Sequence, residues 1–121
     1  MKILVAKSAG YCFGVRDAVK IAYETSKNEG DVYMLGTIVH NERVVDDLSK
    51  SGAKVVNELE AVPKDKPILF RAHGTAPQVW EKAKEKNMNV VDATCPLVIE
   101  IHEEIKKLEA EGRRTIIIGD H

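Results

Sequence analysis

The sequence has almost no net charge and no long hydrophobic run. Its 18 lysine and arginine residues nearly balance 19 aspartate and glutamate residues, so the chain has no general attraction to nucleic acid or anionic lipid. The apolar run near the N-terminus is too short for the core of a signal peptide, and no stretch is long enough to span a bilayer. We therefore expect a cytoplasmic protein that binds neither nucleic acid nor membrane.

Cysteine is scarce as well, with only Cys12 and Cys95 in 121 residues. They lie far apart in the sequence, and because the cytoplasm keeps thiols reduced, a structural disulfide is the weaker interpretation. Metal binding or thiol chemistry is the stronger one. A chain of this length buries one modest core, so a single domain is the default expectation.

Short apolar runs alternate with amphipathic stretches along the chain. The runs predict strands at residues 3–6, 32–35, 54–56, 68–70, 89–91 and 115–118. Between them, apolar residues recur at helical spacing, and Asn41 and Pro77 stand where helices begin. Alternating strands and helices form parallel sheets. The sequence therefore predicts an α/β fold, a parallel sheet with flanking helices.

Two details of this pattern are specific enough to test. Residues 57–67 contain acidic residues and two prolines, so we interpret them as a surface connection. In the last helix, apolar residues predict one buried stripe: Leu97, Val98, Ile101, Ile105 and Leu108.

The residues with chemical potential follow predicted strands. Cys12 follows the first strand, His40 the second, His73 the fourth and Cys95 the fifth. In parallel sheets, the loops that leave the carboxyl ends of strands share one edge, where ligands bind. We therefore expect these four side chains to converge there.

Both cysteines immediately precede a predicted helix, where unpaired backbone N–H groups and the helix dipole favour a thiolate. Two such thiols suggest a shared metal site, although either could instead be a small buried apolar residue. An iron–sulfur cluster accepts ligands from separate loops, and a Cys-Pro pair such as Cys95-Pro96 occurs at ferredoxin-type sites. The alternative is a non-catalytic zinc-binding module in which Cys12, Cys95, His40 and His73 form a tetrahedral site.

The two histidines also have two interpretations. Either could be a structural residue at a helix start, or it could bind phosphate together with backbone N–H groups and the Thr75 hydroxyl. His102, inside the last predicted helix, is interpreted as a solvated residue. A phosphotransfer enzyme using Cys12 and Arg16 is disfavoured, because a phosphate-binding loop needs more residues between them.

Four motifs lie in order along the chain: residues 9–15 (AGYCFGV), 39–45 (VHNERVV), 72–74 (AHG) and 92–98 (DATCPLV). Together they resemble the N-terminal part of the 4-hydroxy-3-methylbut-2-enyl diphosphate reductase family (LytB/IspH). The resemblance implies reductive dehydroxylation of (E)-4-hydroxy-3-methylbut-2-enyl diphosphate to isopentenyl and dimethylallyl diphosphates, in the non-mevalonate isoprenoid pathway.

The resemblance also implies the site residues and partners. Cys12 and Cys95 match the first two ligands of a 4Fe-4S cluster, and His40 and His73 match histidines that bind the diphosphate of the allylic substrate. An electron-donor protein such as ferredoxin or flavodoxin is implied as a partner. No residue of this segment is assigned a direct catalytic role.

The family architecture implies the first of three similar α/β units plus the start of the second. We expect residues 1–96 to form the first, cysteine-bearing unit and residues 97–121 to begin the second. The third cluster cysteine and third diphosphate histidine of the family would then follow the segment, and no role is transferred to His121. We accordingly expect a front part of a longer protein that is inactive alone.

Overall fold

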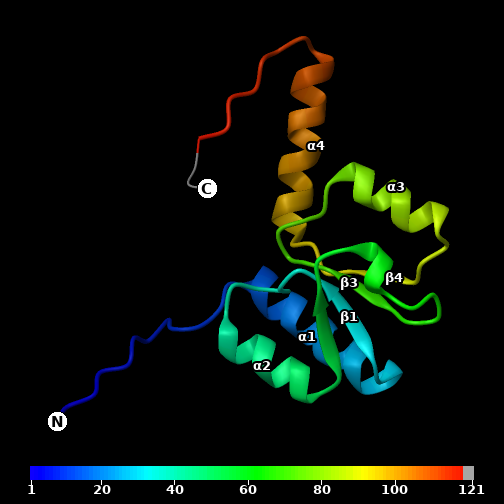
Figure 1. Ribbon diagram of the computed structural model, residues 1–121. Helices are drawn as coiled ribbons and strands as arrows, with labels where there is room; N and C mark the ends of the chain where they lie inside the picture. The colour runs from blue at the N-terminus through cyan, green and yellow to red at the C-terminus, as the bar shows by residue number, and fades with distance from the viewer. Residues whose placement is uncertain (119–121) are drawn as a thin grey trace.

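Four parallel strands form the centre of the molecule in the computed structural model, which describes residues 1–118 (Figure 1). The strands are β1 (Val32–Leu35), β2 (Ala53–Val56), β3 (Ile68–Phe70) and β4 (Val90–Asp92). The α-helices of this part are α1 (Phe13–Glu29), α2 (Glu42–Lys50), α3 (Pro77–Glu85) and α4 (Pro96–Ala110), with a single 3-10 turn, η1 (Leu59–Ala61). The predicted α/β fold is confirmed.

The order of strands across the sheet is β2-β1-β3-β4, and every pairing is parallel. Tyr33 of β1 is in register with Lys54 of β2 on one side and with Ile68 of β3 on the other. Phe70 of β3 is in register with Asp92 of β4. The carboxyl ends of β1, β3 and β4 therefore lie side by side at one edge.

Each face of the sheet has its own core. Val32 and Met34 of β1 and Leu69 of β3 are buried against α1 and α2, together with Leu48. Alternate residues, Ile68 and Phe70, face the other side. This period of two explains how three- and four-residue strands separate two layers of helices.

The second core corrects the interpretation of residues 57–67 as a surface connection. Leu59 and Val62 from this segment are only 5% and 7% exposed, and they pack with Phe70 and Ala83. The ring of Trp80 on α3 meets Phe70 edge-on, with centroids 4.7 Å apart. The segment therefore closes one face of the sheet through η1.

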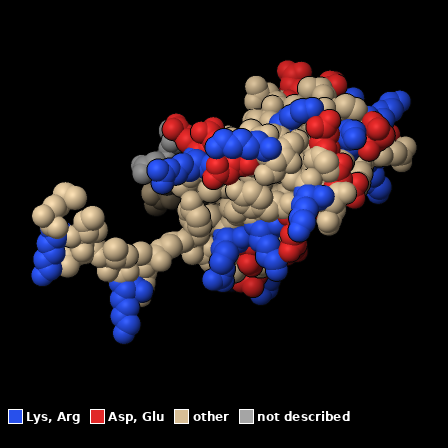
Figure 2. Space-filling view, turned by 90° about the horizontal axis from the view of Figure 1, so that it is seen from below, with Lys and Arg blue, Asp and Glu red and all other residues tan. Residues whose placement is uncertain are grey.

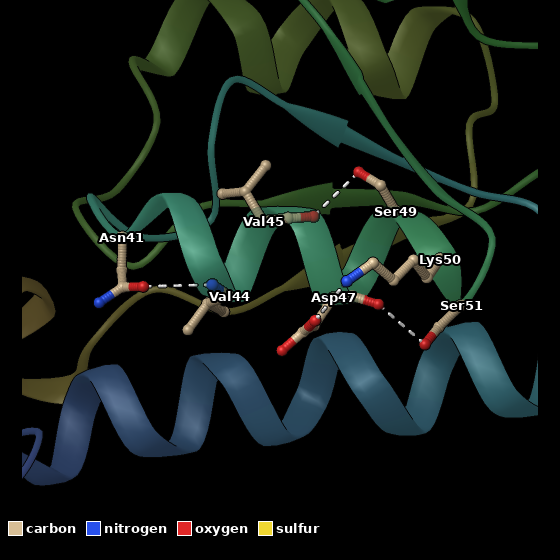
Figure 3. A network of polar contacts seen from close by, with 7 residues as sticks. All are labelled: Asn41, Val44, Val45, Asp47, Ser49, Lys50 and Ser51. Atoms are coloured by element: carbon tan, nitrogen blue, oxygen red, sulfur yellow. Dashed lines mark hydrogen bonds and ion pairs between the residues drawn. The ribbon is translucent and has the colours of Figure 1, made fainter.

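The helix start signals are confirmed. The Asn41 side chain accepts a hydrogen bond from the Val44 N–H at 3.2 Å and so caps α2 (Figure 3). Further along α2, Ser49 Oγ donates to the Val45 carbonyl and Lys50 pairs with Asp47 at 3.0 Å. These local contacts fix the helix that follows the His40 loop.

The two terminal strand predictions are wrong. Residues 3–6 and 115–118 form no strand, and Ile3, Leu4 and Val5 are each at least 75% exposed. A strand must satisfy its backbone N–H and C=O groups against a neighbour, and neither segment pairs with a strand among residues 1–118. Figure 1 shows both segments extending away from the sheet.

The predicted buried stripe of the last helix is also wrong within the described part of the chain. α4 has no buried residue; Leu97 is 50% exposed and Ile101 is 58% exposed. The helix projects from the sheet, as Figure 1 shows, so no second layer covers its apolar side chains.

The visible surface carries acidic and basic side chains intermixed, without a large area of one sign (Figure 2). No helix among residues 1–118 combines the length and the apolar character needed to cross a bilayer.

Candidate functional site

His40 and His73 meet beyond the carboxyl ends of β1 and β3. Their ring centroids are 4.5 Å apart and the ring planes are tilted by 50°. Thirty-two residues separate them in the sequence, yet the adjacent parallel strands bring the two loops together. The expected convergence of the histidines is therefore present, although both side chains remain accessible to solvent.

A tight turn presents His73. The Gly74 N–H donates to the Arg71 carbonyl at 3.0 Å, and Gly74 has φ +86°, in the left-handed region that favours glycine. The Ala72 N–H donates to the Ile38 carbonyl at 3.3 Å. This last bond ties the His73 turn to the loop that carries His40.

The same turn is bonded to the Cys95 segment. The Cys95 N–H donates to the Ala72 carbonyl at 3.0 Å. Just before it, the Asp92 carboxylate accepts hydrogen bonds from the Thr94 N–H and hydroxyl, a local Asx-type turn that directs the chain out of β4. His73 and Cys95 are therefore held in one hydrogen-bonded frame.

Burial of the imidazole lowers the pKa of His73, and the nearby His40 and Arg71 lower it further. Each cause disfavours a positive charge on the ring. A bound anion would act in the opposite direction, because it favours the protonated imidazole.

The cysteines occupy equivalent places at two helix starts. Cys12 is the N-cap of α1 and Cys95 is the N-cap of α4, and neither side chain caps its helix by a hydrogen bond. The Cys95 sulfur lies directly over Gly14, so close that a Cβ on Gly14 would overlap it. The first turn of α1, which begins at Cys12, thus adjoins the Cys95 thiol.

Both thiols are free; Cys12 is exposed and Cys95 is partly buried. Thiolates are the ligands that iron–sulfur clusters use, and Gly14 leaves space beside Cys95 that a larger residue would fill. Two cysteine thiols and this packing fit two ligands of an iron–sulfur cluster.

Comparison with known proteins identifies the family. The sequence profile described as "LytB protein" matches residues 3–121. The chain belongs to the LytB family.

Two curated relatives of this LytB chain are named 4-hydroxy-3-methylbut-2-enyl diphosphate reductase. The chain is 39% identical to the 4-hydroxy-3-methylbut-2-enyl diphosphate reductase of Clostridioides difficile (strain 630), over 99% of this chain and 43% of the relative. Identity to the reductase of Wolbachia pipientis wMel is 42%, over 98% of this chain and 40% of the relative. The chain therefore spans less than half the length of the curated relatives it matches.

Solved structures agree with this family assignment. The chain resembles the E-1-hydroxy-2-methyl-but-2-enyl-4-diphosphate reductase of Plasmodium falciparum with a TM-score of 0.83 and 36% identity, over 87% of this chain and 33% of that one. It resembles a second such reductase, described as the terminal enzyme of the non-mevalonate pathway, with a TM-score of 0.82 and 37% identity, over 98% and 42% of the two chains.

Two alternatives for the LytB site residues lose support. No three Cys, His, Asp or Glu side chains within residues 1–118 are grouped to hold a metal ion, so the four-residue zinc site is not formed. The Arg16 N–H donates to the Cys12 carbonyl at 3.0 Å. Residues 12–16 are thus a helical turn, and they do not form a phosphate-binding loop.

One expectation about position is corrected. Cys12 does not follow a strand, because residues 3–6 are unpaired; α1 and its contact with Cys95 place it near the sheet edge. His121 lies outside the described residues.

His102, interpreted as a solvated residue, is exposed, but sequence reasoning did not place its ring beside Gly74. Its spacing of seven residues from Cys95 was the available signal, since this spacing is two helical turns.

Proposed function

We propose that this chain is the part of a 4-hydroxy-3-methylbut-2-enyl diphosphate reductase that binds the substrate diphosphate and holds two cluster ligands. The observation that carries the proposal is the frame joining His40, His73 and Cys95 through the bonds Ala72 N–H to Ile38 and Cys95 N–H to Ala72. The reductase names of the relatives supply the substrate.

The histidine pair is suited to a diphosphate. Two imidazoles with centroids 4.5 Å apart can donate to neighbouring phosphoryl oxygens. Because proximity of His40 and burial both oppose protonation of His73 in the free protein, the negative charge of a diphosphate would be matched by proton uptake. Binding would thereby anchor one end of the allylic substrate.

Cys12 and Cys95 would hold two of the irons of a 4Fe-4S cluster, and a third cysteine would come from residues beyond this segment. When bound, such a cluster supplies electrons and a Lewis-acidic iron. In the overall reaction, two electrons and two protons enter, the carbon–oxygen bond of the alcohol breaks, and water leaves. The role of this chain is to fix the thiolates and the diphosphate relative to one another.

A ferredoxin or flavodoxin would deliver the electrons, and the reaction would take place in the cytoplasm. Since the site needs groups that this segment does not contain, the segment alone would be inactive.

We propose the domain division at residue 96, as the resemblance implies. α4 supports it, because no residue of this helix is buried while Leu97 and Ile101 are at least half exposed. Residues 1–96 would be the first unit, and residues 97–121 would begin the next.

The proposal is tested by anaerobic reconstitution of the protein containing this chain with iron and sulfide. Cys12→Ser and Cys95→Ser should each lose the brown cluster absorbance and the reductase activity, whereas the matched surface variant Asp17→Ala on α1 should keep both. Retention of an intact cluster and full activity by the double cysteine variant would refute the assignment.

The histidines have a separate test in the same protein. His40→Asn and His73→Asn should raise the KM for the diphosphate substrate while leaving the cluster absorbance unchanged. An unchanged KM in both variants would remove their role in substrate binding.

A further inference from the structure

His102 lies beside the turn that presents His73. The ring belongs to α4, and its Cε1 atom would lie 3.1 Å from a Cβ on Gly74. The same position on Gly74 faces Val98 Cγ1 at 3.5 Å and Thr94 Cγ2 at 3.6 Å. One side of α4, together with Thr94 two residues before the helix, thus forms the surface that faces Gly74.

The residues of this surface share a helix face. Val98 and His102 follow Cys95 by three and seven positions, which places them above one another along α4. Glu100 and Glu104 lie on the opposite side of the helix and are exposed. The contact with Gly74 therefore belongs to one defined face.

The turn at residues 71–74 has hydrogen-bonded support on the sides of Ile38 and Cys95, and its own closing bond joins Gly74 to Arg71. On the α4 side of Gly74, His102 and Val98 stand close enough that a Cβ at this position would meet them. The ring of His102 also borders an open cavity of about 690 Å³ that is lined in addition by His73, Thr75 and Lys106. Gly74 lines the same cavity, so removal of the ring would widen the open space beside the turn.

We propose that His102 is a positioning residue: its ring stands beside Gly74 and limits movement of the 71–74 turn, so that His73 faces His40. This inference rests on the proposed function in one respect, because diphosphate binding by the His73 ring is taken from it. His102 acts through Gly74 and needs no contact with the substrate.

The test compares three variants of the chain with the wild type. His102→Ala removes the ring from an exposed helix position, where alanine favours the helix, so α4 is retained. His102→Phe keeps a flat ring but has no titratable nitrogen. Glu104→Ala, on the opposite face of α4, is the matched control.

The first readout is the nuclear Overhauser effect between the His40 and His73 rings, which reports their proximity without any ligand. His102→Ala should weaken it, whereas His102→Phe and Glu104→Ala should preserve it. The second readout is affinity for inorganic pyrophosphate, which His102→Ala should lower roughly tenfold, as loss of a supporting group commonly does.

An unchanged ring–ring signal in His102→Ala would overturn the inference, and so would a phenylalanine variant as defective as the alanine variant. If the wild-type chain fails to bind pyrophosphate while the ring–ring signal responds as expected, the diphosphate role of His73 fails but the positioning role of His102 stands.

Discussion

Short aliphatic runs occur both in the central sheet and near the two ends of the chain, but they are buried only in the sheet. Ile68, Leu69 and Phe70 of β3 are fully buried. Ile116, Ile117 and Ile118 are 78–94% exposed, although their side chains are as apolar. The difference lies in neighbours: β3 pairs with β1 and β4 and is covered on both faces. An aliphatic run thus becomes a strand only where a partner edge exists.

The same contrast separates the candidate site residues. The loops that carry His40, His73 and Cys95 follow paired strands, and backbone hydrogen bonds join these loops to one another. Cys12 follows the unpaired segment and is exposed, and the contact of Gly14 with Cys95 places α1 beside the others. How firmly each site residue is held therefore depends on how well the element that carries it is packed.

The largest expected change in stability comes from truncating a side chain of the central sheet, compared with one near the end of the chain. Phe70→Ala should lower the free energy of unfolding by about 3–5 kcal/mol, because it leaves a cavity between β3 and α3. Ile117→Ala should change it by less than about 0.5 kcal/mol, since the side chain is already in water. Urea unfolding followed by circular dichroism measures both. Equal losses of unfolding free energy in the two variants would contradict the contrast between the buried and the exposed aliphatic run.

A smaller effect is expected where α1 joins the centre. Gly14→Val should destabilise the fold by about 1–3 kcal/mol, because the new side chain must displace the Cys95 thiol. Asp17→Ala, on the exposed side of the same helix, serves as the control. Urea unfolding gives the stability of each, and a Gly14→Val protein as stable as the control would contradict the observed contact.

The next effect concerns the helix that follows the His40 loop. Asn41→Ala should cost about 1 kcal/mol of stability, because the Val44 N–H loses its acceptor. Ser49→Ala in the same helix is the matched control, since it removes an exposed hydroxyl bonded to Val45. Thermal unfolding of both variants measures the difference, which should disappear if Asn41 does not cap α2.

The smallest effect is electrostatic. His40→Asn should raise the pKa of His73, because it removes a cause that depresses this pKa, while burial, the larger cause, remains. Arg71→Gln should raise it less. Histidine ring titration by NMR measures both shifts, and a pKa that falls in His40→Asn would contradict the pairing of the rings.

The lowered pKa of His73 determines how this residue makes the stability of the fold depend on pH. Because the pKa of folded His73 lies below its ordinary value of 6.5, the unfolded chain binds this proton more tightly. The contribution of His73 to stability is therefore complete above pH 6.5 and is lost as the pH falls toward the folded pKa. His40→Asn should reduce that loss.

Much of the central fold was predictable because local signals and burial agree there. The predicted strands 32–35 and 68–70 match β1 and β3, and those at 54–56 and 89–91 match β2 and β4 within one residue. Asn41 and Pro77 marked the starts of α2 and α3 through capping and fixed φ. These signals act within a few residues and do not require knowledge of the partner.

The failures depend on contacts made at a distance. The runs 3–6 and 115–118 have strand composition, but composition does not reveal whether a neighbouring strand is available. The stripe of α4 has the correct helical period and no covering layer among the described residues. The burial of Leu59 and Val62 was not predicted because their neighbours in the segment are polar, although both residues help to close the second core.

The placement of His40, His73 and Cys95 at one edge was predictable, because parallel topology alone brings the loops after β1, β3 and β4 together. Their detailed arrangement was not. The bonds from Ala72 to Ile38 and Cys95 involve backbone groups that any sequence would supply, and the approach of Cys95 to Gly14 depends on how α1 docks. The roles of Cys12, Cys95, His40 and His73 remain predictions for the experiments above.

The exposed aliphatic ends have a practical consequence for anyone who purifies this chain. Residues 3–6 and 116–118 are apolar and pair with no strand among residues 1–118, so they offer N–H and C=O groups and apolar side chains to any other extended polypeptide. Two copies of this chain can pair through these segments, so concentrated samples of it should self-associate. Substituting lysine at Leu4 and Ile117 would discourage this association while leaving the buried sheet intact.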